Sequence, residues 1–310
     1  YGISMLYGAT GSTLLPEIIA EIQQNGAGNP LVVVGMALVI VAMSFKIAVV
    51  PFHMWTPDVY TGAPTPVTGF LSGAAKAAGF AVFVRVLLTG IPLDGPNWAN
   101  LLWILAVLTM TVGNVMALRQ NEVKRMLAFS SIAHAGYVLV AVVVGSSSAI
   151  SGVIFYSCAY ALMGTGAFGI LTIKDAGRIP QTFDDLAGYG KRNPLLALIM
   201  TLFIFSLIGL PLTGGFIGKL QIFSAALKDG WIWLTVIAIL NSALSVYYYL
   251  RVVMFMYMRE GALPEGSDLS AKTSGFALTG LIGTAAAVLY LGVFPDEIME
   301  LASLSILALL

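Results

Sequence analysis

The chain has 310 residues, of which 58% are hydrophobic and only 10% are charged, with a mean hydropathy of +0.92. Soluble domains carry roughly 25% charged residues, so this chain has too few charges to cover a water-facing surface. Fifteen Lys and Arg residues balance fifteen Asp and Glu residues, which excludes a nucleic-acid binder that depends on a basic field. The single cysteine excludes an intramolecular disulfide framework and a cysteine-ligated metal site within the chain. The composition predicts a polytopic membrane protein.

The first thirty residues predict the end of an apolar helix and a polar connection. The chain opens without an initiator Met, and residues 1–8 are mostly apolar. A cleavable signal peptide needs a basic region before its apolar stretch, and no basic residue precedes this one. We therefore expect further helices upstream of Tyr1. Residues 1–30 are assigned to the end of a transmembrane helix and an external loop.

Eight later segments are long and apolar enough to cross a bilayer, which takes about 20 residues. They are residues 31–54, 65–90, 98–118, 125–146, 149–173, 195–227, 231–258 and 273–294. Their lengths far exceed the ~10-residue alternating segments of an outer-membrane barrel. The predicted fold class is an all-α polytopic membrane protein with about eight full transmembrane helices and an N-terminal stub.

The positive charges predict how these helices are oriented. If the loops alternate sides, one side carries ten Lys and Arg residues, and the other carries only Arg85 and Lys228. The ten are Arg119, Lys124, Arg125, Lys174, Arg178, Lys191, Arg192, Arg251, Arg259 and Lys272. Cytoplasmic loops are enriched in Lys and Arg, so the charged loops are predicted to be cytoplasmic.

Three remaining lysines, Lys46, Lys76 and Lys219, fall inside predicted spans. A lysine in the hydrocarbon layer costs roughly 2.5–3.5 kcal/mol on insertion scales. All fifteen acidic residues fall in loops, at span ends or in the terminal segments, so no full span offers a carboxylate near its middle. Burial disfavours the charged form of an amine. These lysines therefore predict proton handling, and the alternatives are snorkelling from a helix end or pairing with a carboxylate elsewhere.

Helix-breaking residues stand beside two of these lysines. Pro51 follows Lys46 by five residues, and Pro211, Gly214 and Gly215 precede Lys219. Broken helices at membrane depth are tolerated where they line a cavity or lie buried in protein, and they mark ion sites in transporters. An ordinary proline kink is the simpler interpretation of each break. The coincidence of lysine and break, occurring twice, favours a broken helix, the second near residues 211–215.

His134 is the one histidine well inside a span, in SSIAHAGYVLV. Its unperturbed pKa near 6.5 suits a proton relay between the lysines, and a core histidine bonded to a serine or carbonyl is an equally weighted alternative. The Tyr247–Tyr248–Tyr249 run before Arg251 predicts an interfacial aromatic belt.

Four motifs resemble subunit N, also called subunit 2, of proton-pumping NADH:quinone oxidoreductase, respiratory complex I. They are KIAVVPFHMWTPDVYTGAPTPVTGFLSGAAK at 46–76, NEVKRMLAFSSIAHAGYVLVA at 121–141, GLPLTGGFIGK at 209–219 and SVYYYLRVV at 245–253. The resemblance runs in order along the chain as far as about Arg259.

The resemblance implies an antiporter-like bundle of fourteen helices with two inverted five-helix repeats. Residues 31–90 would form the last two helices of the first repeat, residues 91–260 the second repeat, and residues 261–310 a C-terminal transmembrane helix and tail. Lys46, Lys76 and Lys219 match the family's proton-channel lysines, and His134 matches a polar position on its central axis. The family's key glutamate would lie upstream of Tyr1.

The resemblance also implies a non-redox membrane-arm subunit of a translocase, which moves protons as quinone is reduced in a neighbouring module. No cofactor is expected in this chain; NADH or another donor, FMN, iron–sulfur clusters and quinone would be bound by other subunits. Expected partners are other membrane-arm subunits, including antiporter-like ones, and membrane lipid. The expected location is a bacterial plasma membrane, or a thylakoid or inner mitochondrial equivalent.

Two competing functions share many of these features. One is a subunit of a multisubunit cation/proton antiporter or membrane-bound hydrogenase. The other is a structural membrane subunit whose lysines only pair with partner subunits.

Overall fold

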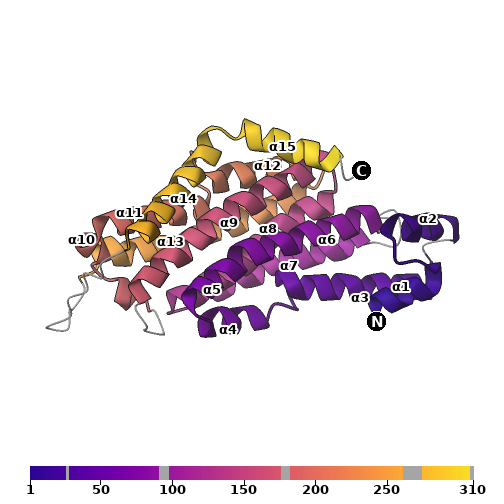
Figure 1. Cartoon of the computed structure of the whole chain (residues 1–310), viewed down its shortest axis with the longest axis horizontal. Coiled ribbons are helices and arrows are strands. Elements are labelled where there is room, and N and C mark those ends of the chain that lie inside the picture. Colours follow the sequence, from indigo (N-terminus) through magenta and orange to yellow (C-terminus); the bar gives the residue numbers. More distant parts are fainter. Residues whose placement is uncertain (26–27, 91–97, 176–181, 261–273, 308–310) are drawn as a thin grey trace.

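The fold is a bundle of long helices that run roughly side by side (Figure 1). The computed structural model describes residues 1–25, 28–90, 98–175, 182–260 and 274–307. Within those residues the chain forms helices and a single isolated bridge between Glu122 and Thr182, with no strand. The all-α prediction is confirmed.

The N-terminal part contains three helices and the first helix break. They are α1 (Gly2–Thr10), α2 (Leu15–Asn25) and α3 (Pro30–Ile47). The side chain of Asn29 accepts a hydrogen bond from the backbone of Leu31, and Pro30 occupies the first turn, a favoured way to start a helix. Residues 48–54 interrupt the predicted span 31–54, and the short helix α4 (Trp55–Gly62) follows.

The centre of the bundle is formed by four spans. The first is continuous through α5 (Thr65–Phe70), a π-helical turn η1 (Leu71–Ala75) and α6 (Lys76–Gly90). The others are α7 (Trp98–Leu118), α8 (Val123–Val144) and α9 (Ser147–Asp175). All but two residues of α8 are buried in the bundle, so α8 is its central helix.

Glycines bring α7 and α8 close together. A Cβ atom at Gly113 would lie 2.6 Å from the backbone nitrogen of Ala133, and one at Gly136 would lie 2.6 Å from that of Met110. Only glycine fits this backbone approach, which is the typical way in which membrane helices pack tightly.

The C-terminal part contains the second helix break. A 3₁₀ turn η2 (Asp184–Leu186) and α10 (Tyr189–Arg192) precede α11 (Pro194–Ile208), and α12 (Gly214–Lys228) follows the break. The last helices are α13 (Ile232–Met258), α14 (Gly275–Val293) and α15 (Asp296–Leu307). Residues predicted to be a tail thus form the helix α15, which contacts α9.

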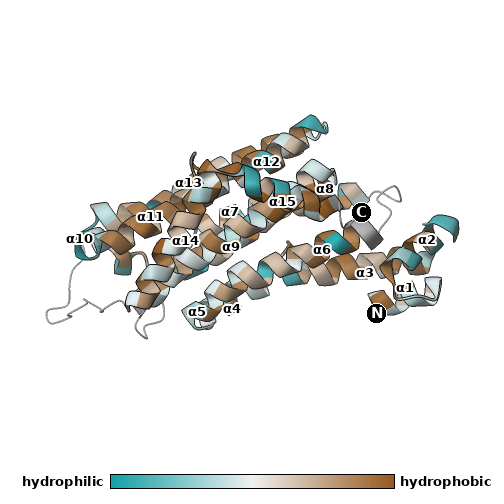
Figure 2. Ribbon diagram, turned by 45° about the horizontal axis from the view of Figure 1, so that its top comes forward, coloured by the Kyte–Doolittle hydropathy of each residue, from teal (hydrophilic) through white to brown (hydrophobic). Residues whose placement is uncertain are grey.

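The apolar helices fit a multi-pass membrane protein. Seven described helices are long and apolar enough to span a bilayer, or eight if the bent pair Asp184–Arg192 and Pro194–Ile208 counts as one span. Figure 2 shows hydrophobic residues over most of the bundle, with hydrophilic residues gathered near α2, α10 and one end of α12. The predicted segment 195–227 is broken, as expected from its prolines and glycines, into the separate helices α11 and α12 of 15 residues each.

The described basic loops meet at one end of the bundle. That end holds the start of α5, α10, the start of α11 and the end of α13 (Figure 1). Arg85 lies towards the end of α6 and Lys228 at the end of α12, both at the opposite end in Figure 1. That this charged end faces the cytoplasm stays a prediction. Arg178, Lys272 and the turn at 93–97 lie outside the described residues.

Candidate functional site

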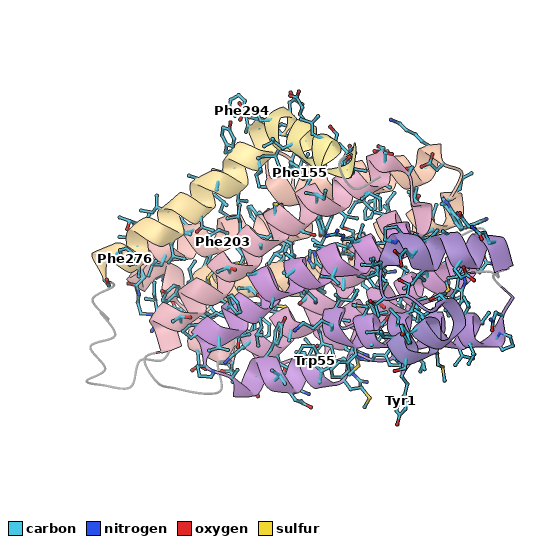
Figure 3. The ribbon with its side chains drawn as sticks, turned by 45° about the vertical axis from the view of Figure 1, so that its right-hand side comes forward. Tyr1, Trp55, Phe155, Phe203, Phe276 and Phe294 are labelled. Carbon is cyan, nitrogen blue, oxygen red and sulfur yellow. The ribbon has the colours of Figure 1, made fainter. Side chains whose placement is uncertain are left out.

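Local contacts of Trp55 hold the two sides of the first helix break together. α3 ends where Ala48 adopts a left-handed conformation with φ 63°. The indole nitrogen of Trp55 donates to the carbonyl of Phe45 at 2.8 Å, and the two rings lie 5.5 Å apart. Trp55, labelled in Figure 3, therefore ties the start of α4 to the last turn of α3.

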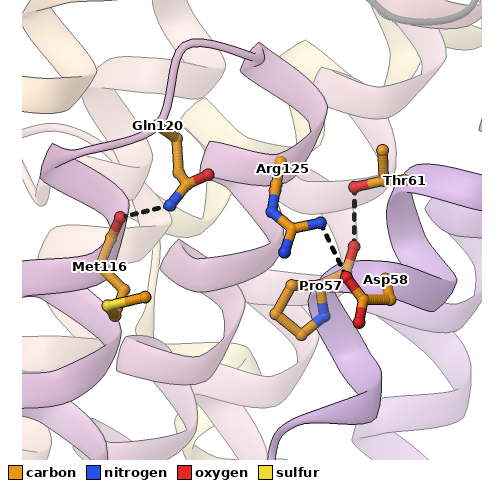
Figure 4. Close-up of polar contacts among 6 residues, drawn as sticks. All are labelled: Pro57, Asp58, Thr61, Met116, Gln120 and Arg125. Carbon is orange, nitrogen blue, oxygen red and sulfur yellow. Dashed lines mark hydrogen bonds and ion pairs between the residues drawn. The ribbon is translucent and has the colours of Figure 1, made fainter.

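Two consecutive basic residues fasten α4 to the start of α8. The ammonium of Lys124, which is buried, donates to the carbonyl of Ala63 at 2.6 Å, just after the end of α4. Arg125 forms an ion pair with Asp58 at 2.8 Å (Figure 4). A cation at a helix C-terminus interacts favourably with the last carbonyls and the helix dipole. Lys124 was predicted only as a loop charge, and its burial gives it a structural role.

Lys46 lies within a candidate membrane span, as predicted, but the described bundle does not enclose it. It is the second-last residue of α3 and is exposed on the outside of the described bundle. The reason is that α3 packs one face inward, through residues such as Met36 and Ile40, and leaves the face with Phe45 open. Of the three intramembrane lysines, only Lys46 is exposed in the described part of the chain.

Lys76 is buried, with 6% of its surface exposed. It follows directly on the π-helical turn of the α5–α6 span, a feature frequently found at functional sites. Its ammonium donates to the carbonyl and the hydroxyl of Ser131 on α8, at 2.6 and 2.5 Å. An ammonium has three N–H donors, so one remains for a further acceptor.

The second helix break supplies the surroundings of Lys219. α11 ends at Gly209 with φ 89°, Leu212 also has a positive φ of 69°, and α12 begins at Gly214. The break therefore lies at residues 209–213, two residues earlier than predicted, because the left-handed Gly209 ends α11 before Pro211 is reached. Gly214 and Gly215 belong to α12.

Lys219 is 5% exposed and uses all three of its N–H donors. It donates to the carbonyls of Leu207 and Ile208 at 3.0 and 2.8 Å, and to the hydroxyl of Ser242 at 3.0 Å. The last carbonyls of a helix lack intrahelical partners, so the break in the span exposes the acceptors that hold this cation. The ammonium also lies 5.0 Å from the ring centre of Tyr137 on α8, within cation–π range.

His134 lies between the two buried lysines along α8. Ser131 contacts Lys76, Tyr137 contacts Lys219, and His134 stands midway in sequence. Three residues of an α-helix rise about 4.5 Å, so α8 presents these contacts at regular intervals. One imidazole nitrogen of His134 bonds to the hydroxyl of Tyr156, and the other bonds to that of Tyr249 at 2.8 Å.

The tyrosine run on α13 is not an interfacial belt. Only Tyr247 is exposed, whereas Tyr248 and Tyr249 are fully buried. The inner face of α13 carries Asn241, Ser245, Tyr248 and Val252, at spacings of four, three and four residues. This helical period is the sequence pattern that could have placed Tyr248 inside.

Asn114 is a central residue that the sequence interpretation missed. It lies on α7, fully buried. Its amide oxygen accepts from the hydroxyl of Tyr248 at 2.8 Å, and its amide nitrogen donates to Tyr137 at 3.1 Å and to Asn241. The sequence signal that could have identified it is an asparagine inside an otherwise apolar span, because amides in membrane helices form hydrogen bonds to neighbouring helices.

Among the residues that the structure describes, no cluster of three or more His, Cys, Asp or Glu residues could hold a metal ion. The polar interior consists instead of amines, hydroxyls, one imidazole and amides.

Comparison with known proteins identifies the family. Residues 1–245 match the family described as NADH:quinone oxidoreductase/Mrp antiporter, TM. The chain belongs to this family. It is therefore an integral membrane protein with an antiporter-like bundle.

Individual relatives agree with this assignment. The chain is 50% identical over 304 residues to NADH-quinone oxidoreductase subunit N of Trichlorobacter lovleyi, covering 97% of this chain and 62% of that protein. A chain of respiratory complex I from Thermus thermophilus with bound aureothin is 36% identical, with a TM-score of 0.80, covering 97% of this chain and 64% of that chain.

A more distant structure shows how widely the fold is shared. A chain of the Mrp complex from Dietzia sp. DQ12-45-1b has a TM-score of 0.85 at 23% identity, covering 97% of this chain and 63% of that chain. The chain spans about three-fifths of the length of the curated relatives it matches.

Proposed function

We propose that this chain is part of a subunit of the N type in an NADH:quinone oxidoreductase, and that it moves protons across the membrane while other subunits transfer electrons and reduce quinone. The observation that carries the proposal is the pair of buried lysines on either side of His134, each held by uncharged acceptors. The family and the relatives named subunit N support the same function.

Neutral acceptors permit a lysine to change its protonation state. A carboxylate partner would favour the charged amine strongly, whereas carbonyl and hydroxyl groups serve both forms. As an ammonium, Lys219 donates to Leu207, Ile208 and Ser242. As a neutral amine it keeps two donors for the carbonyls, and its lone pair accepts from the Ser242 hydroxyl, which can act as donor or acceptor.

His134 is proposed to relay protons between the two sides of its ring. With Tyr156 on one nitrogen and Tyr249 on the other, a proton arriving at one nitrogen allows release from the opposite one. Each neutral tautomer keeps both hydrogen bonds, because a hydroxyl accepts from the N–H nitrogen and donates to the bare one. The imidazole therefore switches without losing a partner.

Between His134 and Lys219 the hydrogen-bond network includes a side-chain amide. Asn114 links Tyr248 to Tyr137, and a side-chain amide does not ionise at physiological pH. We assign Asn114 to positioning these tyrosines, and Lys219 to gaining and releasing a proton in response to the charge on the His134 side.

The wider setting follows the same proposal. Lys46, exposed on α3, would meet a charged partner contributed by another segment or subunit. Neighbouring membrane-arm subunits and lipid would cover the apolar outer faces. The basic loops would face the cytoplasm of a bacterial cell or the equivalent compartment. NADH or another donor, FMN, iron–sulfur clusters and quinone would bind to other subunits.

The test compares Lys76→Ala with Lys228→Ala in inverted membrane vesicles that contain the full-length protein in its complex. Lys228 is an exposed lysine at the end of α12 and serves as the matched control. We expect Lys76→Ala to lower donor-driven proton uptake per quinone reduced in assembled complex, and Lys228→Ala to match wild type. Unchanged uptake in Lys76→Ala would refute the proposal.

A cation/proton antiporter is the second candidate, favoured by the fold shared with the Mrp complex. It predicts proton movement that follows a sodium gradient and needs no electron donor. The same vesicles, given a sodium gradient without donor, distinguish the two functions.

A further inference from the structure

The π-helical turn η1 interrupts an otherwise α-helical span directly before Lys76. A π-helix closes its hydrogen bonds over five residues instead of four, and it occurs mostly as single turns inside α-helices. The turn has the sequence LSGAA and contains no proline, so the distortion needs another cause. Two hydroxyl groups that meet at one carbonyl beside the turn supply it.

The carbonyl of Gly69, two residues before the turn, accepts hydrogen bonds from two side chains. Ser72, fully buried within the turn, donates to it at 3.0 Å. Thr165 on α9 donates to it from across the helix interface at 3.4 Å. A hydroxyl that bonds to a helix carbonyl competes with the backbone N–H for that carbonyl and bends the helix locally. The two bonds therefore favour a turn that departs from α geometry at this place.

The neighbouring helix α9 also fits closely against the turn. A Cβ atom at Gly73 would lie 2.5 Å from the hydroxyl oxygen of Thr165 and 3.2 Å from the backbone oxygen of Ala161. Thr172, seven residues further along α9, instead donates to the carbonyl of Phe168 in its own helix. Both threonines line the same groove between α5, α9 and α14, so they differ in their hydrogen bonds rather than in their surroundings.

From this arrangement we propose that Ser72 and Thr165 are positioning residues for Lys76. By bonding to the Gly69 carbonyl they hold the π turn open, and the turn aims the lysine at Ser131. Lys76 is the first residue after the turn, so the turn sets the direction in which its side chain leaves the helix. This inference rests on the proposed function, because it concerns a lysine that carries protons in that proposal.

Closing the turn to α geometry would rotate the helix that follows it by one residue. Successive residues of an α-helix are about 100° and 1.5 Å apart. A shift of that size moves the ammonium of Lys76 away from the carbonyl and hydroxyl of Ser131, which it now reaches at 2.6 and 2.5 Å. The lysine would stay within the span but lose these acceptors on α8. Proton transfer at Lys76 is therefore expected to depend on two hydroxyls that do not themselves carry the proton.

The first test removes each hydroxyl from the assembled complex of the full-length protein. Ser72→Ala and Thr165→Val lack the hydroxyl, Thr165→Ser keeps it, and Thr172→Val makes the same change on α9 at a hydroxyl that bonds within its own helix. Losing one hydrogen bond changes an equilibrium by about two- to tenfold. We expect donor-driven proton uptake per quinone reduced to fall by that factor in Ser72→Ala and Thr165→Val, and to match wild type in Thr165→Ser and Thr172→Val. Equal losses in Thr165→Val and Thr172→Val would overturn the inference.

A map of the assembled complex shows the turn itself. In the double variant Ser72→Ala with Thr165→Val, we expect residues 71–75 to be α-helical and Lys76 to have left Ser131, together with a larger loss of uptake than in either single variant. A double variant that keeps the π turn, or that loses it with wild-type uptake, would show that the two hydroxyls do not position the lysine. If the double variant does not assemble, the comparison of Thr165→Val with Thr165→Ser decides in its place.

Lys76→Ala distinguishes this inference from the proposed function. Lost uptake in Lys76→Ala with wild-type uptake in the hydroxyl variants overturns the positioning role and leaves the proposed function standing. Wild-type uptake in Lys76→Ala overturns the proposed function, and the positioning role with it. Low uptake in Lys76→Ala and in Thr165→Val, restored in Thr165→Ser, supports both.

Discussion

The two broken spans of this protein differ in how they surround the lysine beside the break. The second break, between α11 and α12, turns the carbonyls of Leu207 and Ile208 onto Lys219, which is buried with all three donors used. The first break, between α3 and α4, leaves Lys46 exposed and has unpaired buried atoms on Ser44, His53 and Thr56 beside it.

The difference shows that a lysine beside a helix break has no fixed role. Where the lysine lies after the break, as Lys219 does, it reaches back to the carbonyl end of the preceding half-helix, which favours a cation. Lys46 lies before its break, within α3, and its side chain is exposed although it also lines a small cavity next to Lys76. All the polar contacts of the lysine at the second break lie within the described residues, whereas the first break leaves buried polar atoms that have no partner among those residues.

The largest effect is expected from adding a methyl group at the tightest contact of the second break. A Cβ atom at Gly215 would lie 1.9 Å from the backbone oxygen of Ser206, so Gly215→Ala must push α11 and α12 apart. Overpacking of this kind typically costs about 1–3 kcal/mol, and backbone contacts reach the upper end. We expect most of the assembled complex to be lost, measured by its recovery from membranes.

The control for this variant is Gly283→Ala. Gly283 lies inside α14 with no atom within 4 Å of a Cβ, and alanine is favoured over glycine in a helix by roughly 1 kcal/mol. Recovery should equal or exceed that of wild type. Equal recovery of both variants would contradict the close packing of the second break.

A second prediction concerns the bonded network next to Lys219. Asn114→Leu removes the partner of Tyr248 and Tyr137 inside the bundle. Leaving buried groups unpaired costs about 1–3 kcal/mol, so heating should inactivate the complex several degrees earlier. An unchanged inactivation temperature would mean that these tyrosines find other partners.

A third prediction compares the hydroxyl partners of the two buried lysines. Ser131→Ala leaves Lys76 with only the carbonyl at that position, whereas Ser242→Ala leaves Lys219 with two carbonyls. Loss of one buried hydrogen bond changes an equilibrium by roughly tenfold. Proton uptake per quinone reduced should therefore fall more in Ser131→Ala than in Ser242→Ala, and the reverse order would show that Lys76 is the better-held charge.

The smallest effect is expected at the ion pair that docks α4 at the first break. Arg125 and Asp58 are 35% and 72% exposed, and exposed ion pairs contribute only about 0–1 kcal/mol. A double-mutant cycle with Arg125→Gln and Asp58→Asn should give a coupling in that range that shrinks with added salt. A coupling that is large and insensitive to salt would mean that the first break depends on this pair.

The sequence predicted the membrane bundle because its signals are local. Long apolar runs gave the spans, Pro51 and Pro211 indicated the two breaks, and intramembrane lysines identified the polar interior. The burial of Lys76, with no acid in its span, followed from the same reasoning.

The features that could not be predicted from the sequence depend on which face of each helix turns inward. Lys46 and Lys219 look alike as lysines beside breaks, and only the packing of α3 shows that one of them is exposed. Tyr248 and Tyr249 resembled an interfacial pair until the inner face of α13 was known, and Asn114 joins helices far apart in sequence. Such contacts are non-local, so spacing along the chain cannot reveal them.

The most direct test of the central claim is Lys219→Arg, with donor-driven proton uptake and quinone reduction measured together in assembled complex. Arginine keeps the positive charge and the donors for the carbonyls of Leu207 and Ile208, but it does not release its proton in proteins. If Lys219 works by gaining and losing a proton, uptake per quinone reduced should fall in this variant although the complex assembles. Uptake equal to wild type would show that only a fixed charge is needed there, and the account of proton transfer through this lysine would be wrong.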